Sequence, residues 1–340
     1  MRKLIGLCLS MVLLLGLVAG CGSANSTSST SSAPLTTLRV AYMPNMASSS
    51  ALIAAIHMGY FKQVGLNIQL VQFATGPAEI AAMGSGNIDI SDIGFGAHSL
   101  LSKGQAQVIT LDCTGLSDQI LANKDKGIKT IADLKGKTIG TSLGTSSQII
   151  LDLALSSVGM TEKDVKVVSM DPSAAVTAMV TGKIDAAAIW SPSTYVVKEK
   201  MGDKAIMLAN DNTFKNEMQF PGSYVVAPNY AAQHKDLCVK FVQGFFKGMD
   251  YRKDHLKQVA DWVAAEIKQD PATIEQTTGD ANWLTSKDVY DSVNDGSLKQ
   301  MYEQVQNVFL QQKAIPATVN VDSFVHYDIM TQAYKANQKQ

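Results

Sequence analysis

Two short segments combine glycines with hydroxyl or imidazole side chains at the predicted start of a helix. They consist of Gly144, Thr145, Ser146 and Ser147, and of Gly94, Phe95, Gly96 and His98. The free backbone N–H groups and the dipole at such a start attract an anion, and the imidazole of His98 can donate a further hydrogen bond. We therefore predict that these segments bind a small oxyanion. The alternative is an ordinary cluster of residues at each helix start, without a ligand.

Arginine, the usual partner of an oxyanion, is scarce in this chain. After the apolar N-terminal stretch, the sequence contains only Arg39, in a predicted strand, and Arg252, in a predicted late helix. A guanidinium fork, which binds an anion through two parallel hydrogen bonds, is therefore not expected in the site. The helix starts must supply the N–H groups instead.

Three acidic residues could mark a positively charged group on the ligand. Asp92 and Asp112 stand near the ends of predicted strands, and Asp171 precedes Pro172. An unpaired carboxylate in a closed cleft would cost several kcal/mol, so an amine or an amidine would be a natural partner. Solvation or helix capping is the alternative, and it is favoured for Asp171. A plain oxyanion and a zwitterion that also carries a positive group both remain open.

Further residues near the same strand ends could form the walls of a binding site. Asn45 and Met46 follow the first predicted strand, and Trp190 follows a later one. Trp190 is placed to cover a ligand or to line a hinge. Packing in the core is the alternative, because aromatic residues after strands are as often buried there.

An internal repeat indicates how these segments are positioned. Residues 81–93 and 177–189 are identical at six matching positions, among them Asp89 and Asp185. Each copy predicts a helix that ends at a glycine and leads into a short apolar strand, and each follows a further strand, loop and helix. Two such copies predict two similar α/β lobes with parallel or mostly parallel sheets. Asp89 and Asp185 stand at strand starts and are predicted to be structural.

Ligands of such sheets bind beyond the carboxyl ends of the strands. The segments that follow the predicted strands are 43–50, 94–99, 142–147 and 190–195. From about residue 225 onward, apolar residues at spacings of three and four predict mainly helices. We predict that lobe 1 consists of residues 38–117 and 223–338, and that lobe 2 consists of residues 118–222.

The N-terminal residues indicate export. A short basic start, an apolar stretch to Val18 and small residues before Cys21 are typical of a signal peptide, assigned here to residues 1–20. The sequence Leu-Val-Ala-Gly-Cys resembles the lipobox of bacterial lipoproteins, which implies acylation of Cys21 and an extracytoplasmic protein that is anchored to the bacterial cell membrane. Residues 21–37 then form the lipidated cysteine and a flexible Ser/Thr-rich linker. A signal peptide that is cleaved elsewhere is the alternative.

Composition and motifs exclude several classes of function. The 340 residues carry a formal net charge of −1, so a basic surface for nucleic acid is not expected. The sequence contains no GxSxG, GxxxxGK[ST] or HExxH motif and no clustered Cys/His set. The sequence therefore lacks the motifs that hydrolases, nucleotide-dependent enzymes and metal sites require. We predict neither a cofactor nor a metal. Cys113 and Cys238 are expected to be buried thiols, with a disulfide as the alternative.

Four segments together resemble the solute-binding proteins of ABC importers for nitrate, sulfonates, taurine and thiamine-pyrimidine precursors. They read LRVAYMPN at 38–45, GYFKQVGLNI at 59–68, IADLKGKTI at 131–139 and GKIDAAAIW at 182–190. The resemblance implies the type II periplasmic binding protein fold, in which two Rossmann-like lobes joined by a two-stranded hinge close on a small ligand. It also implies a membrane permease and a cytoplasmic ATPase as partners. Asp92 stands where many relatives have Tyr or Phe.

The sequence thus predicts a monomeric, lipid-anchored receptor for a small organic oxyanion, an alkanesulfonate or a taurine-like molecule, and no enzymatic activity. The same transport role for a thiamine-pyrimidine precursor or for nitrate is one alternative. An enzyme that resembles pyrimidine synthase is another, although this chain lacks the cysteine-rich segment of that enzyme. A sensory lipoprotein without a transporter is the third.

Overall fold

The computed structural model describes residues 34–215 and 218–339. Within these residues, no helix is both long enough and apolar enough to cross a membrane. The predicted signal peptide, the acylation site Cys21 and most of the linker lie outside the described residues. Export and lipid anchoring therefore stay predictions from the sequence.

The first sheet contains six strands in the described part of the chain, in the order β11-β4-β10-β3-β1-β2. The strands are β1 (Thr36–Tyr42), β2 (Leu66–Gln72), β3 (Ile90–Ile93), β4 (Gln107–Gly115), β10 (Pro221–Val226) and β11 (Ala281–Trp283). β1 is parallel to β2 and β3, and β10 runs antiparallel between β3 and β4. The strands predicted from the sequence in this lobe are confirmed, with ends that shift by a few residues.

The second sheet contains five described strands in the order β7-β6-β8-β5-β9. The strands are β5 (Asp118–Asn123), β6 (Thr138–Thr141), β7 (Lys166–Ser169), β8 (Ala186–Trp190) and β9 (Ala205–Asn210). β6 is parallel to β7 and β8, and β5 runs antiparallel between β8 and β9. Both sheets therefore place three parallel strands beside one antiparallel strand, and the predicted α/β fold with two similar lobes is confirmed.

The prediction of parallel or mostly parallel sheets needs one correction. One antiparallel strand in each sheet, β5 or β10, is the strand by which the chain enters that sheet from the other one, and β11 adds a further antiparallel pair at the edge of the first sheet. Residues 116–117 join β4 to β5, and the chain returns between β9 and β10. A strand that arrives from the opposite lobe runs against its neighbours, so it creates antiparallel pairs that the repeat alone does not reveal.

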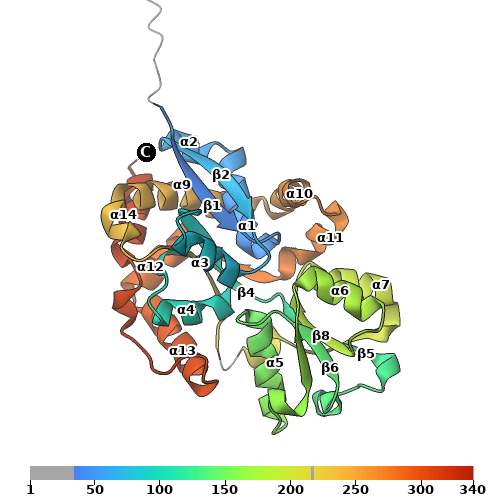
Figure 1. The fold of residues 1–340 in the computed structure, drawn as a ribbon. Helices are drawn as coiled ribbons and strands as arrows, with labels where there is room; N and C mark the ends of the chain where they lie inside the picture. The colour runs from blue at the N-terminus through green and yellow to red at the C-terminus, as the bar shows by residue number, and fades with distance from the viewer. Residues whose placement is uncertain (1–33, 216–217, 340) are drawn as a thin grey trace, which may run out of the picture. The chain divides into compact units, whose positions relative to one another are not determined.

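Helices flank both sheets, as Figure 1 shows. α5, α6 and α7 contact the second sheet, whereas α1, α2, α3 and α9 contact the first. The helices are α1 (Met46–His57), α2 (Tyr60–Gln63), α3 (Gly76–Gly84), α4 (Ser99–Ser102), α5 (Ser146–Ser157), α6 (Pro172–Val180), α7 (Ser193–Met201), α8 (Tyr230–Gln233), α9 (Lys235–Asp254), α10 (Leu256–Ile267), α11 (Pro271–Gln276), α12 (Ser286–Asn294), α13 (Ser297–Gln311) and α14 (Tyr327–Asn337). The chain after residue 225 is mainly helical, as predicted, with the short β11 as an exception.

The two aspartates of the repeat have the same structural role in both lobes. Asp89 accepts a hydrogen bond from the backbone N–H of Arg39 at 2.8 Å, and Asp185 accepts one from the backbone N–H of Thr138 at 2.9 Å. Each carboxylate thus joins the turn before one strand of the sheet to the neighbouring strand. The prediction that these aspartates are structural is confirmed.

The end of α13 packs differently from what the sequence suggests. Val305, Val308 and Phe309 belong to the hydrophobic core of the second sheet, together with Ile139 and Phe95. The prediction placed residues 223–338 wholly in lobe 1. Apolar spacing identifies a helix but not the sheet on which it packs, so this contact between the two lobes was not foreseen.

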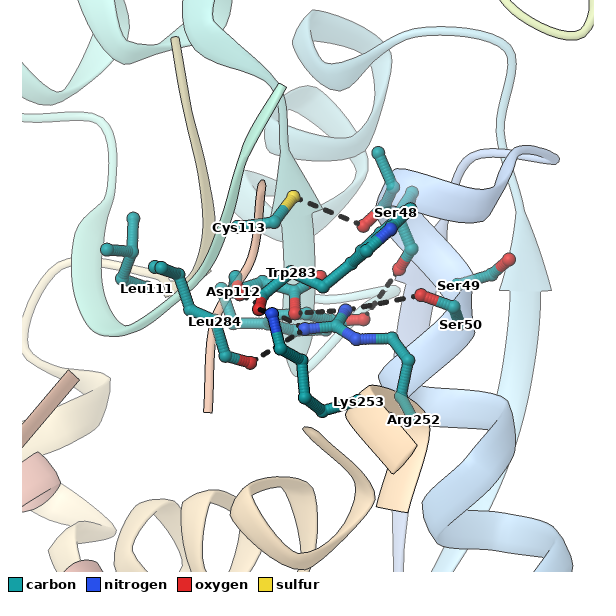
Figure 2. A network of polar contacts seen from close by, with 12 residues as sticks. Ser48, Ser49, Ser50, Leu111, Asp112, Cys113, Arg252, Lys253, Trp283 and Leu284 are labelled. Atoms are coloured by element: carbon teal, nitrogen blue, oxygen red, sulfur yellow. Dashed lines mark hydrogen bonds and ion pairs between the residues drawn. The ribbon is translucent and has the colours of Figure 1, made fainter. Parts of the chain in front are cut away.

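A buried ion pair holds α9 against the first sheet (Figure 2). Nη1 of Arg252 lies 2.7 Å from Oδ1 of Asp112, and neither side chain is more than 1% exposed. The guanidinium also donates to Oγ of Ser50 at 3.2 Å and to the carbonyl of Leu284 at 3.2 Å, and it lies over the ring of Trp283. One side chain therefore links α1, β4, α9 and the end of β11.

The two arginines of the described chain offer a matched test of this arrangement. We expect Arg252→Met to lower the free energy of unfolding by about 3–5 kcal/mol, because the carboxylate of Asp112 would stay buried without a partner. Arg39→Met is the control: Arg39 pairs with Asp89, but its side chain is 37% exposed, so we expect a loss of about 1 kcal/mol or less. Urea unfolding of both variants measures the difference, and similar losses in both would contradict this role of Arg252.

Candidate functional site

A cavity of about 70 Å³ lies between the two sheets. It is located at the carboxyl ends of β3 and β8, next to the start of α5. Seven candidate residues from the sequence line it, namely Asn45, Asp92, Gly94, Phe95, Thr145, Ser146 and Trp190. A cavity of this volume holds a few water molecules or a compact ligand. The strand ends thus form a site where the topology predicts one.

The first-sheet wall is positioned by the turn between β1 and α1. Oδ1 of Asn45 accepts a hydrogen bond from the backbone N–H of Ser48 at 2.9 Å and so caps α1. The hydroxyl of Ser48 in turn accepts from the backbone N–H of Met43 at 2.8 Å. All three residues line the cavity, and these bonds fix the turn that carries them.

The start of α5 borders the cavity from the side of the second sheet. Thr145 takes the N-cap position, but its hydroxyl donates to the carbonyl of Ser142 at 2.7 Å and makes no capping bond to α5. The N–H of Gly144 donates to Oε1 of Gln148 at 2.7 Å. Of the predicted helix-start residues, Thr145 and Ser146 are therefore the ones that face the cavity, and Gly144 is engaged within the loop.

Asp118, which the sequence analysis missed, stands at this helix start. Oδ1 of Asp118 accepts a hydrogen bond from the hydroxyl of Ser147, and its backbone N–H donates to Asp211 at 2.8 Å. Burial is the main cause that raises the pKa of the Asp118 carboxyl to about 6. No motif marks this residue, because the crossing between the sheets brings it to α5. The predicted anion site thus already contains a carboxyl group of the chain itself.

Asp92, at the end of β3, provides a second carboxyl group in the wall. Its side chain is 3% exposed, and its Oδ1 has no hydrogen-bond partner among the described residues. Burial raises the pKa of this carboxyl well above its usual range. Among the described residues that line the cavity, there is no lysine, arginine or histidine. The described wall therefore contains carboxyl groups but no basic side chain, in agreement with the sequence-based expectation that Asp92 could contact the ligand.

Two other predicted ligand residues are engaged elsewhere. Asp112 pairs with Arg252 and does not line the cavity. Nδ1 of His98 lies 3.0 Å from the carbonyl oxygen of Gly94, so it carries the proton, and Nε2 accepts from the hydroxyl of Ser223 at 2.8 Å. Burial lowers the pKa of His98 to about 4. His98 is therefore a neutral, buried residue that does not line the cavity, and the sequence analysis did not foresee its bond to Ser223.

Four further predicted site residues do not line the cavity. Asp171 caps α6 through the N–H of Ala174 at 2.8 Å, as its alternative interpretation held. Met46 packs in the core of the first sheet, and Ser147 points to Asp118. The fourth, Gly144, is not among the residues that line the cavity. These differences share one cause. The end of a strand or the start of a helix locates the backbone of a residue, but it does not give the direction of the side chain.

Gly96 is a contact between the lobes rather than a ligand residue. It lies in the short 3₁₀ helix η1 (Phe95–His98), which packs against α5. A Cβ atom at Gly96 would lie 2.1 Å from the carbonyl carbon of Thr145, so only glycine allows this approach of the two backbones.

Both described cysteines, Cys113 and Cys238, are buried free thiols. This confirms the expectation of buried thiols rather than the alternative of a disulfide.

Two α/β sheets joined by two crossings, with a small cavity between them, define the class of two-lobed binding folds. The family described as NMT1/THI5 like matches residues 46–258. A protein of Brucella abortus (strain 2308), named as a candidate binding protein, is 31% identical over 273 residues, which cover 80% of this chain and 85% of that protein. A protein of Bacillus subtilis (strain 168), named as a candidate aliphatic sulfonates-binding protein, is 28% identical and covers 82% and 84% of the two chains.

The fold agrees with solved structures. The alkanesulfonate-binding protein SsuA from Xanthomonas axonopodis pv. citri, bound to MOPS, superimposes with a TM-score of 0.69 at 21% identity and covers 86% of this chain and 99% of that chain. The family match spans more than half of the sequence. This chain belongs to the NMT1/THI5-like family.

The close contact at Gly96 generates a prediction. We expect Gly96→Ala to fold normally but to separate η1 from α5, because the added methyl group meets backbone atoms that cannot rotate away. The radius of gyration from small-angle scattering should increase, and affinity for a bound solute should fall about tenfold or more. Gly84→Ala is the control, since a Cβ atom there meets nothing within 4 Å. Unchanged scattering and affinity in Gly96→Ala would show that the contact is dispensable.

Proposed function

We propose that this protein is the extracytoplasmic binding component of an ABC importer. It takes a small solute into the cavity between its sheets and delivers the solute to a membrane permease that a cytoplasmic ATPase drives. The observation that carries this proposal is the cavity itself, which both sheets line at the strand ends. The family membership and the transport-related names of relatives support it. Acylation of Cys21 would keep the receptor at the membrane.

The proposed solute is a small organic oxyanion, an alkanesulfonate or a taurine-like molecule. Its oxyanion lies against Thr145 and Ser146, where the first turn of α5 offers N–H groups and a hydroxyl. The names of two relatives, an aliphatic sulfonates-binding protein and a taurine-binding protein, agree with this solute class. The carboxyl of Asp118 stands at the same helix start, so the solute must approach the turn from the cavity side.

A thiamine-pyrimidine precursor is a second candidate, and the aromatic wall favours it. Phe95, Trp190 and Phe220 all line the cavity, and their rings can pack on the faces of a planar heterocycle. The buried carboxyls of Asp92 and Asp118 can accept hydrogen bonds from an exocyclic amine. The transport role is the same for both candidates.

A binding role suits the wall better than a catalytic one. Among the described lining residues there is no histidine that could serve as a general base. Burial and the neighbouring carboxyl of Asp112 raise the pKa of the Cys113 thiol well above its usual range, which makes it a poor nucleophile at neutral pH. These groups therefore support recognition of a solute.

Thermal unfolding in the presence of single solutes tests the proposal. We expect taurine, ethanesulfonate or 4-amino-2-methylpyrimidine to raise the melting temperature, because a solute that binds only the folded state stabilises it. Ser146→Ala should weaken binding of a sulfonate by about five- to tenfold, the loss of one hydrogen bond. Ser173→Ala, in the first turn of α6 and outside the cavity, should leave binding unchanged. A protein that no solute of this panel stabilises would contradict the proposed solute classes.

A further inference from the structure

Two buried acidic side chains near the cavity, Asp92 and Glu79, form no ion pair with a cation in the described chain, and the hydroxyl of Ser48 is the side-chain donor beside Asp92. Asp92 is 3% exposed and its Oδ1 is unpartnered, and Glu79 is fully buried with both carboxyl oxygens unpartnered. Asp112 is equally buried, but Nη1 of Arg252 lies 2.7 Å from its Oδ1. The chain therefore compensates one buried carboxylate with an arginine and leaves the other two acids without a cation.

The two acids without a cation belong to elements that contact each other, α3 and β3. Asp92 is on β3 and lines the cavity, and Glu79 is on α3, which packs on β3. Burial is the main cause that raises the pKa of Glu79, and the negative charge of Asp92 raises it further, so the two carboxyl groups interact. Gly76, at the start of α3, lines the same part of the cavity. A ligand in the cavity thus meets Asp92 directly, and Asp92 in turn interacts with Glu79.

We propose that Asp92, supported by Glu79, binds a protonated nitrogen of the transported solute, an ammonium or an amidinium group. This inference rests on the proposed function and narrows its solute class. A taurine-like zwitterion or a protonated aminopyrimidine fits this wall, and a plain alkanesulfonate or nitrate does not. A metal ion is not the occupant, because the described residues contain no group of three or more His, Cys, Asp or Glu side chains arranged to hold one.

Burial explains why a cation is needed. An ionised carboxylate that leaves water without a partner is costly, and the group keeps a proton instead. Burial raises the pKa of Asp92 and of Glu79 well above the usual range. The charged or titratable groups that surround the pair are Asp112, Cys113, Tyr224 and Arg252. Of these, Arg252 is the one cation, and it is already bonded to Asp112.

This arrangement couples binding to protons in a defined direction. The ligand-free pair holds a proton, and an incoming ammonium favours the ionised form and lowers the pKa of the pair. Binding therefore releases a proton, and affinity for the cationic solute rises with pH until the ligand-free pair is itself ionised. A plain sulfonate would show the opposite preference, because it would favour the protonated pair.

Titration calorimetry with matched solutes tests the inference on the whole protein. Taurine carries an ammonium group and ethanesulfonate does not, so we expect taurine to bind about tenfold or more tightly. Buffers with different enthalpies of ionisation should reveal proton release for taurine, and 4-amino-2-methylpyrimidine serves as the amidine-type probe. Asp92→Asn should abolish the preference for taurine, while Asp171→Asn, outside the cavity, should keep it. Equal affinity for taurine and ethanesulfonate, or a taurine affinity unchanged by Asp92→Asn, would overturn the inference.

If no solute of the panel binds, this outcome counts against the proposed function. A second measurement then still tests whether Asp92 is an uncompensated buried acid. Asp92→Asn should raise the melting temperature of the ligand-free protein by about 2–4 °C near pH 8, because it removes an uncompensated buried acid. Asp112→Asn is the matched control on the neighbouring buried acid and should lower the melting temperature, since Arg252 would lose its partner. A loss of stability in Asp92→Asn comparable to that of Asp112→Asn would show that Asp92 has a structural partner, and would overturn the inference.

Discussion

The cost of burying a carboxylate is the constraint on which the rest of this structure depends. Two carboxylates of the first lobe meet it through arginines from distant elements: the buried Asp112 is paired with Arg252, and the partly exposed Asp89 with Arg39. These pairs fix helices and strands around the first sheet. Because both arginines of the described residues are used in this way, neither lines the cavity. The acids in the wall, Asp92 and Asp118, are therefore the groups on which our proposal for the solute depends.

The sequence allows the elements and the place of the site to be predicted, because both follow from local patterns. The repeat of 81–93 at 177–189 identifies a helix, a turn and a strand in each lobe, and the strand ends locate the cavity. Asn45, Thr145 and Trp190 were found because they directly follow strands or begin helices. The rule that ligands bind at the carboxyl ends of the strands of α/β sheets does not depend on side-chain contacts. The location of the cavity could therefore be predicted from the order of strands and helices in the sequence.

The fate of single polar side chains could not be predicted, because it depends on partners far along the chain. Asp112 and Arg252 are 140 residues apart, and His98 is bonded to Ser223, 125 residues away. Asp118 reaches α5 only through the crossing between the sheets. Glu79 lies on α3, where the spacing of apolar residues gives no sign of a buried acid. These residues change the ligand chemistry, since they add acids to the site and remove a histidine from it.

We propose that this protein binds a solute with a basic nitrogen at the acidic wall of its cavity. Mass spectrometry of the small molecule that remains bound after purification under non-denaturing conditions tests it most directly. The account predicts a compound with an amine or amidine, either a taurine-like zwitterion or an aminopyrimidine. A co-purified alkanesulfonate without a basic nitrogen, or nitrate, would contradict it.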